Sequence, residues 1–239
     1  MELISQASHN SFGAVVPWTV HLFPLAGILF YVLYPKSLRI SSDLLQRLSI
    51  IHNAGLVLFS AGIFVSLCAV LIEKGVVFST GHYFRSPMVD TIILLFYLSK
   101  YYEFFDTFLL YLKGKEPIFL QKYHHIGAVI VWHLCYVYKV DAIWISTLVN
   151  SFVHTIMYFY YLGCLMKWNW VRSIKQYITS LQLVQLCVPS VVALVCYYPP
   201  AETPFNYGII VFFVAYVSVL VYLFGQFYVA NYLRPKKAD

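Results

Sequence analysis

The sequence predicts an all-α, polytopic membrane protein with seven transmembrane helices. Of its 239 residues, 61% are hydrophobic and only 11% are charged, and long apolar stretches recur along the whole chain. Soluble domains carry about 25% charged residues, so this composition leaves little room for one. We therefore expect residues 1–239 to form a single membrane-embedded domain in contact with membrane lipid.

Each predicted span is long and apolar enough to cross a bilayer, which takes about 20 residues. Short polar or helix-breaking segments separate the spans, such as KGKEP and YYPPAETP. The third, fourth and fifth spans are joined by very short loops, which predicts antiparallel neighbours packed as two tight helical hairpins. The spans are residues 17–34, 50–72, 89–112, 118–137, 142–164, 176–198 and 206–232.

The basic residues predict the orientation of the spans. Twelve of the 16 Lys and Arg residues flank one set of span ends, three flank the opposite set, and Lys100 lies inside the third span. Because Lys and Arg mark the cytosolic side, we expect a cytosolic C-terminus and a lumenal N-terminus. This asymmetry accounts for the net charge of +6 without nucleic acid. The twelve are Lys36, Arg39, Arg47, Lys113, Lys115, Lys122, Lys167, Arg172, Lys175, Arg234, Lys236 and Lys237.

Residues 233–239 are predicted to form a cytosolic tail. The chain ends in RPKKAD, which places Lys236 and Lys237 where a dilysine signal for retrieval to the endoplasmic reticulum has its lysines. We therefore expect a multi-pass protein of the endoplasmic reticulum membrane. The first sixteen residues carry no Lys or Arg, so we expect no cleavable signal peptide.

Polar residues inside the predicted spans fall at one depth. An unpaired charge at the membrane centre costs about 2.5–3.5 kcal/mol, so these side chains must face a protein interior. At a rise of 1.5 Å per residue they lie about 9–18 Å from the cytosolic helix ends. This predicts a polar chamber that opens to the cytosol and is closed toward the lumen by aromatic-rich helix ends. The residues are Lys100, Glu103, Asp106, His124, His154, Gln182 and Gln185.

Histidines in such a chamber favour acyl-transfer chemistry. A neutral imidazole can attack an activated acyl group or accept a proton. Acyl-CoA suits a chamber that opens to the cytosol, because its head is polar and its tail belongs in the membrane. Basic residues at the cytosolic span ends are candidates to bind the CoA phosphates: Lys113, Lys115, Lys122, Arg172 and Lys175.

Other interpretations stay open at this point. A di-iron desaturase or hydroxylase also uses paired membrane histidines, but only three or four of the eight histidines share the layer, so we expect no metal site. A transporter is a second alternative, although neither paired broken helices nor an internal repeat is visible. Gln182 and Gln185 could serve as interhelical contacts and Lys100 with Glu103 as a structural ion pair. His133 is expected to pack, and no role is assigned to His9, His21, His52 or His82.

Four stretches resemble motifs of the ELO family of very-long-chain fatty acid elongases. KYYEFFDT (100–107) is similar to K-x-x-E-x-x-D-T, and QKYHH (121–125) to the H-x-x-H-H box. NSFVHTIMYFYY (150–161) resembles N-x-x-H-x-x-M-Y-x-Y-Y, and TSLQLVQ (179–185) resembles T-x-x-Q-x-x-Q. The order and spacing agree over a block of about residues 90–190.

The resemblance implies a 3-oxoacyl-CoA synthase, which condenses acyl-CoA with malonyl-CoA and releases CO2 and CoA. It implies catalytic roles for His124, His125, His154 and Asn150, with the acyl group carried on His124. It places Lys100, Glu103, Asp106, Gln121, Tyr158, Tyr161, Gln182 and Gln185 in the geometry of the site. No bound cofactor is implied. The expected partners are the reductases and dehydratase of the elongation cycle, and a homodimer is left open.

Gln121 departs from the family pattern, in which His usually opens the box. We expect its amide to orient His124 or His125 from one turn away. The stretch LKGKEPIFLQKYHHIGA also resembles microalgal elongases of C18 Δ9-polyunsaturated acyl chains, which carry Gln at this place. This favours a polyunsaturated C18 substrate, while chain length itself is not fixed by the sequence.

Overall fold

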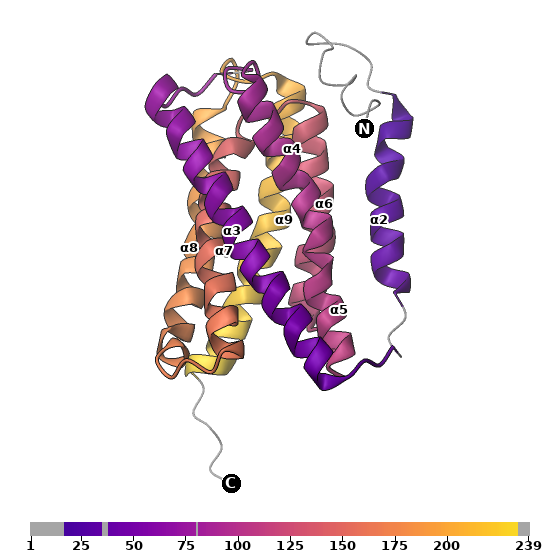
Figure 1. The fold of residues 1–239 in the computed structure, drawn as a ribbon. Coiled ribbons are helices and arrows are strands. Elements are labelled where there is room, and N and C mark those ends of the chain that lie inside the picture. The colour runs from indigo at the N-terminus through magenta and orange to yellow at the C-terminus, as the bar shows by residue number, and fades with distance from the viewer. Residues whose placement is uncertain (1–16, 35–37, 80, 234–239) are drawn as a thin grey trace.

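The architecture is all-helical, as the sequence predicts. A computed structural model describes residues 17–34, 38–79 and 81–233, and every regular element in these ranges is a helix (Figure 1). Lys236 and Lys237 lie outside the described residues, so the retrieval signal stays a prediction. The elements are η1 (Trp18–His21), α2 (Leu22–Leu33), α3 (Ser42–Lys74), α4 (Pro87–Tyr102), α5 (Phe104–Leu112), α6 (Phe119–Val137), α7 (Ile143–Leu165), η2 (Val171–Ile174), α8 (Lys175–Cys196), α9 (Pro204–Tyr228) and η3 (Val229–Leu233).

Several helices are capable of crossing a membrane, which makes this a multi-pass membrane protein. Four stretches among the described residues are long and apolar enough on their own: α3, α7, Val171–Cys196 and Pro204–Leu233. A shorter apolar stretch covers Trp18–Leu33. The two remaining predicted spans coincide with α4–α5 and α6, which carry charged and histidine residues. The total of seven spans and the orientation of the termini stay predictions.

The helices begin where local chemistry favours it. The Ser41 hydroxyl accepts a hydrogen bond from the Leu44 backbone N–H at 3.3 Å, which caps α3. The Thr203 hydroxyl does the same for Asn206 at the start of α9, at 3.2 Å. Pro87 and Pro204 open α4 and α9, where a missing backbone N–H costs nothing.

Six helices form a closed ring in the order α3, α7, α8, α9, α6 and α4, and α2 lies outside it against α6 (Figure 1). The predicted α4–α6 hairpin packs closely. The predicted tight α6–α7 hairpin is wrong, because these helices touch along a short stretch only. The Trp132 indole N–H donates to the Thr147 hydroxyl at 3.2 Å near their connecting turn. The separation of α6 from α7 leaves space inside the ring.

The third predicted span, residues 89–112, is broken rather than continuous. A turn at Glu103 separates α4 from α5. The Asp106 N–H bonds to the Glu103 carbonyl at 3.1 Å, three residues back instead of four. This tighter turn lies at the point where two acidic side chains reach the interior of the ring.

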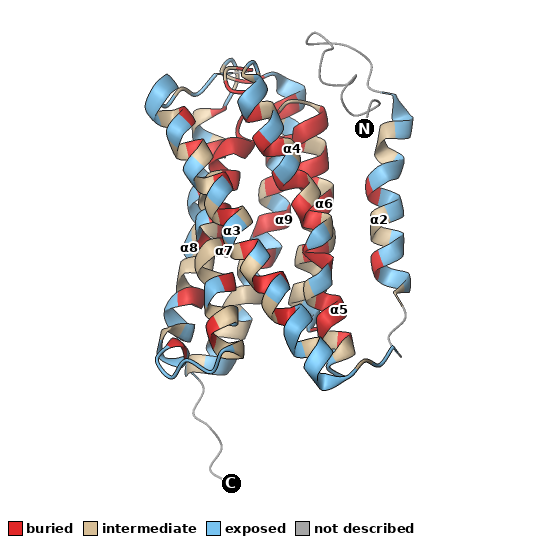
Figure 2. Cartoon of the chain, viewed as in Figure 1, coloured by how far each residue is buried: buried red, intermediate tan, exposed pale blue. Residues whose placement is uncertain are grey.

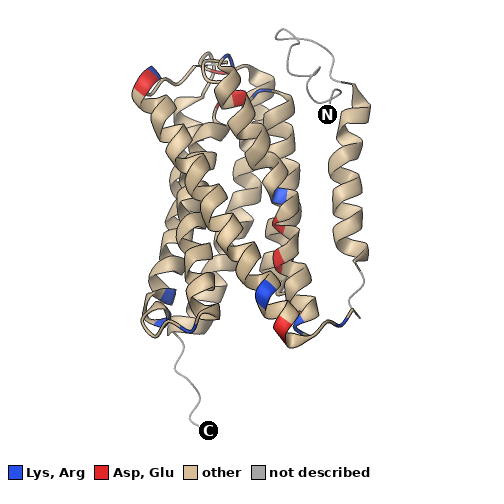
Figure 3. Cartoon of the chain, viewed as in Figure 1, with Lys and Arg blue, Asp and Glu red and all other residues tan. Residues whose placement is uncertain are grey.

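Burial differs between the inner and outer faces of the helices (Figure 2), and charged residues differ in number between the two ends of the ring (Figure 3). Buried residues face into the ring and exposed ones outward (Figure 2), including Ile72 and Leu58 on α3 with 86% and 75% of their surface exposed. Such apolar exposure fits contact with lipid. Most of the described Lys and Arg residues gather at the end of the ring where α3 begins and α9 ends (Figure 3). At the opposite end an aromatic cluster fills the ring, in which the Trp144 indole donates to the Tyr197 hydroxyl at 2.9 Å.

Candidate active site

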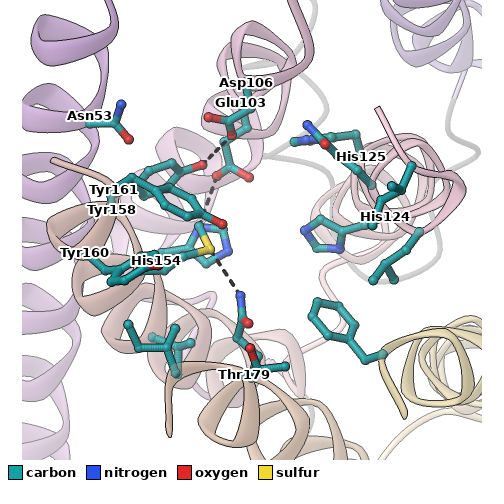
Figure 4. A pocket seen from close by; sticks show the side chains of 18 of the residues that line it. Asn53, Glu103, Asp106, His124, His125, His154, Tyr158, Tyr160, Tyr161 and Thr179 are labelled. Carbon is teal, nitrogen blue, oxygen red and sulfur yellow. Dashed lines mark hydrogen bonds and ion pairs between the residues drawn. The ribbon is translucent and has the colours of Figure 1, made fainter. Parts of the chain in front are cut away.

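A cavity of about 550 Å³ lies inside the ring. Every ring helix except α4 contributes to its wall, together with α5 and the turn residue Glu103. Figure 4 shows His124 of α6 and His154 of α7 on opposite walls with their rings facing the space between them. Six of the seven residues in the polar layer expected from helical depth, all except Lys100, line this cavity. Its polar lining residues from the predicted site are Glu103, Asp106, Gln121, His124, His125, His154, Tyr158, Tyr161, Gln182 and Gln185.

His124, His154 and Glu103 approach one another across the cavity. One side-chain nitrogen or oxygen atom from each lies within 4.8 Å of the other two. His154 Nδ1 is 3.6 Å from Glu103 Oε1, close enough for charge attraction but too long for a hydrogen bond. The two imidazoles can therefore contact one small reacting group, with a carboxylate beside them.

A buried hydrogen-bonded chain fixes Glu103 from behind. The Lys100 ammonium lies 2.7 Å from Glu103 Oε1 and also donates to Asn150 Oδ1 at 3.3 Å. The Asn150 amide in turn donates to Gln185 Oε1 at 3.1 Å. Lys100 is only 2% exposed, and its ammonium also lies 3.9 Å from the Phe96 ring centroid. Lys100 and Asn150 thus stand behind the cavity wall and act through Glu103 and Gln185.

Asp106 joins three helices. One carboxylate oxygen accepts the Tyr158 hydroxyl of α7 at 2.7 Å, and the other lies 2.9 Å from His52 Nε2 of α3. The sequence assigns no role to His52. The available signal was the polar pair His52–Asn53 inside an otherwise apolar run, and Asn53 also lines the cavity.

Gln121 bonds elsewhere than expected. Its amide donates to the Thr107 hydroxyl at 3.2 Å, and Thr107 is bonded to the Tyr31 hydroxyl of α2 at 3.0 Å. Among the described residues, the Gln121 side chain therefore bonds to Thr107 rather than to His124 or His125. His125 instead packs against the rings of Tyr31 and Phe104, each 6.1 Å away between centroids. Gln121 links the outer helix α2 to the wall of the site.

Tyr216 of α9 is a further contact that the sequence did not reveal. Its hydroxyl donates to the His124 backbone carbonyl at 2.9 Å and lies 3.5 Å from His124 Nδ1. A Cβ at Gly127 would come within 2.0 Å of the Tyr216 ring. Gly127 in the middle of α6 was the signal for such a close approach.

The five basic residues predicted to bind CoA lie in different surroundings. Lys113 and Lys175 line the cavity, and burial together with the neighbouring Lys115 lowers the pKa of Lys113. Arg172 lines a separate adjacent cavity, with Lys167 and Lys113. Lys122 pairs with Glu116 at 3.7 Å. Of the five predicted CoA-binding residues, Lys113 and Lys175 line the cavity, whereas Lys115, Lys122 and Arg172 do not.

Glu103, His124 and His154 also have the chemistry of metal ligands. However, the Glu103 oxygen nearest to His154 is the one already paired with the Lys100 ammonium. A divalent cation would have to compete with that fixed positive charge. The donor set therefore fits proton transfer and charge stabilisation better than tight metal binding.

Comparison with known proteins places the chain among lipid-elongating enzymes. Residues 14–239 match the GNS1/SUR4 family (ELO). The chain is 31% identical over 240 residues to fatty acid elongase sre1 of Dictyostelium discoideum, covering 91% of this chain and 86% of that protein. It is 35% identical over 225 residues to fatty acid elongase 2 of Trypanosoma brucei brucei, covering 84% and 82%. It is 29% identical over 233 residues to very long chain fatty acid elongase 4 of Macaca mulatta, covering 92% and 73%.

Proposed function

We propose that this chain, which belongs to the GNS1/SUR4 (ELO) family, catalyses the condensing step of fatty acid elongation. In this reaction acyl-CoA and malonyl-CoA give a 3-oxoacyl-CoA two carbons longer, with CO2 and free CoA. The observation that carries the proposal is the meeting of His124, His154 and Glu103 in one cavity inside the helical ring. The family match and the names of the relatives support the same class of reaction.

The first half-reaction transfers the acyl group to the protein. A nitrogen of His124 attacks the thioester carbonyl, the C–S bond breaks, and the imidazole proton passes to the departing CoA sulfur. His124 then carries the chain as an acyl-imidazole. Tyr216 suits this step because it binds the His124 backbone and limits where that ring can lie.

The second half-reaction forms the new carbon–carbon bond. Malonyl-CoA loses CO2, and the electron pair left on its α-carbon attacks the acyl carbon on His124. The C–N bond breaks, and the imidazole recovers one proton from solvent, so one proton is consumed overall. No redox cofactor is needed for this balance.

His154 is the group placed to stabilise charge that develops on a thioester oxygen. Glu103 Oε1 lies 3.6 Å from His154 Nδ1 and is also paired with the Lys100 ammonium. Asn150 holds Gln185 at the wall, so we assign it a positioning role. Lys113 and Lys175 at the mouth supply positive charge for CoA phosphates.

The wall of the cavity suits an aliphatic substrate. Apolar side chains such as Val153, Leu186 and Phe224 complete the lining between the polar groups. We propose a long-chain acyl-CoA substrate. A polyunsaturated C18 chain is the finer proposal and rests on the sequence likeness around Gln121. Location in the endoplasmic reticulum and cooperation with reductases and a dehydratase belong to the same proposal.

The test uses microsomes from an elongase-deficient host that expresses this chain. Radiolabelled malonyl-CoA is supplied with saturated C16 and C18, oleoyl, linoleoyl and α-linolenoyl CoA, and products are resolved by length. We expect a product two carbons longer that disappears in His124→Ala and His154→Ala at equal expression. No product from any acyl-CoA with well-inserted protein would overturn the proposal.

A further inference from the structure

We propose that His52 of α3 is a positioning residue that holds the His154 side of the site through Asp106 and Tyr158. The inference deepens the proposed condensing function and rests on it. It starts from a buried histidine that the reaction scheme does not use. His52 is 5% exposed and does not itself line the cavity.

The contacts of His52 define where its proton lies. Its Nε2 is 2.9 Å from Asp106 Oδ1, while its Nδ1 is buried with no hydrogen-bond partner among the described residues. Two acceptors facing each other would repel, so Nε2 carries a proton and its N–H donates a hydrogen bond to the carboxylate. Rings of Tyr102 and Phe105, 5.2 and 6.4 Å from the His52 ring, surround the pair. The His52 ring therefore makes one hydrogen bond among the described residues, from Nε2 to Asp106.

Asp106 passes this constraint to α7. Its second oxygen accepts the Tyr158 hydroxyl at 2.7 Å, so the two oxygens have different partners on two different helices. A carboxylate fixed at both oxygens cannot rotate without breaking a charge-assisted bond. Tyr158, which is 1% exposed, is thereby fixed in direction.

Tyr158 completes the link to the reacting group. Its ring meets the His154 ring edge-on, with centroids 5.5 Å apart and planes at 82°. Figure 4 shows Tyr158 and His154 side by side on the same wall, below Asp106. The chain of contacts thus runs from α3 to the His154 imidazole. Small displacements of a reacting group are costly, since an error of about 1 Å can reduce a rate about 100-fold.

Two substitutions of similar size separate the hydrogen bond from packing. His52→Leu fills the space without a donor, and His52→Gln keeps an amide N–H. We expect His52→Leu to lower kcat about ten- to a hundredfold, by displacement of His154, with KM for malonyl-CoA nearly unchanged. His52→Gln should recover most of the loss. Leu56, one turn along α3, is buried and does not line the cavity. Leu56→Ala is therefore the matched control for lost packing, and it should leave kcat within about twofold, as for a site independent of the reacting groups.

A double-mutant cycle tests whether His52 acts through Asp106. If it does, His52→Leu adds little further loss of kcat in an Asp106→Asn background. Additive losses would overturn the proposal. So would equal kcat values for the Leu and Gln variants, or a loss as large in Leu56→Ala.

A second readout does not depend on elongase activity. The rate at which diethyl pyrocarbonate modifies His154 in the purified full chain is followed by peptide mass spectrometry. His52→Leu and Tyr158→Phe should change this rate by the same factor, whereas His52→Gln and Leu56→Ala should not. Unchanged His154 labelling in His52→Leu would overturn the proposal. Absent condensing activity with a changed labelling rate would instead count against the proposed reaction alone.

Discussion

The Tyr216 hydroxyl of α9 donates to the backbone carbonyl of His124 on α6 at 2.9 Å. This contact ties the last ring helix to the turn that carries the proposed nucleophile. It depends on Gly127, because any side chain there would collide with the Tyr216 ring. The position of His124 is thus set by a partner 92 residues away in the sequence.

Gly127→Ala tests this close approach. The added methyl would lie 2.0 Å from Tyr216 Cε2, so we expect overpacking to cost about 1–3 kcal/mol of stability and kcat to fall with it. Thermal unfolding in detergent and the elongation assay measure the two effects. Gly55→Ala on α3, where no atom lies within 4 Å of the new Cβ, should be neutral or slightly stabilising. Equal behaviour of the two variants would contradict the contact.

The buried ion pair of Lys100 with Glu103 predicts that the stability losses of the two single variants do not add in the double variant. Removal of one partner leaves an uncompensated buried charge, which costs about 3–5 kcal/mol. Lys100→Met and Glu103→Gln should each lower the thermal midpoint strongly. The double variant should lose less stability than the more damaged single variant. A double loss equal to the sum of the two would show that the groups do not depend on each other.

Metal removal provides a test of the competing interpretation. Because the Lys100 ammonium already binds the Glu103 oxygen that lies nearest to His154, we expect EDTA or 1,10-phenanthroline to leave kcat unchanged. The assay is run before and after chelator treatment and desalting. Loss of activity that one added metal restores would establish a metal mechanism at Glu103, His124 and His154.

Asp141, in the turn between α6 and α7, predicts a pH-dependent stability. Burial raises its pKa from 3.8 to about 6, although N–H groups of Tyr83 and Phe84 donate to it at 3.1 and 3.2 Å. The folded state then binds the proton more tightly than the unfolded state. Its contribution is greatest below pH 4, falls as pH rises through the window from 4 to 6, and is lost above it, by about 3 kcal/mol in total.

Thermal unfolding from pH 4 to pH 8 checks this prediction. The loss of stability with rising pH should be smaller in Asp141→Asn than in the wild type. The exposed Asp43, whose side chain is 74% accessible, is the control, and Asp43→Asn should keep the wild-type slope. A wild-type slope of the opposite sign across this window that Asp141→Asn abolishes would contradict the assignment.

The sequence predicted those features that depend on local pattern. Hydropathy and breakers gave the helices, and helical spacing with equal depth brought His124, His154 and Glu103 to one layer. Local pattern carries no information on which helices touch. The ring order therefore had to come from the structure, as did the separation of α6 from α7 and the contacts of His52 and Tyr216. Gln121 shows the same limit, since its amide selects Thr107 across helices over a histidine on its own helix.

The break at Glu103 escaped prediction for a different reason. Neither Gly nor Pro marks the turn, and the hydrophobic run continues through it without a polar interruption that ends a span. The buried side chains of Lys100 and His154 hold Glu103 at the point where the helical hydrogen-bond pattern is interrupted between α4 and α5. Tertiary contacts here override the local preference.

The most direct test of the account is the capture of the acyl group on His124. The purified full chain is incubated with a long-chain acyl-CoA in the absence of malonyl-CoA, and intact and peptide masses are recorded. We predict one acyl group per chain on the peptide that contains His124, absent in His124→Ala and discharged as 3-oxoacyl-CoA when malonyl-CoA is added. Formation of product without this adduct, or an adduct on another residue that discharges at the rate of turnover, would contradict His124 as the nucleophile.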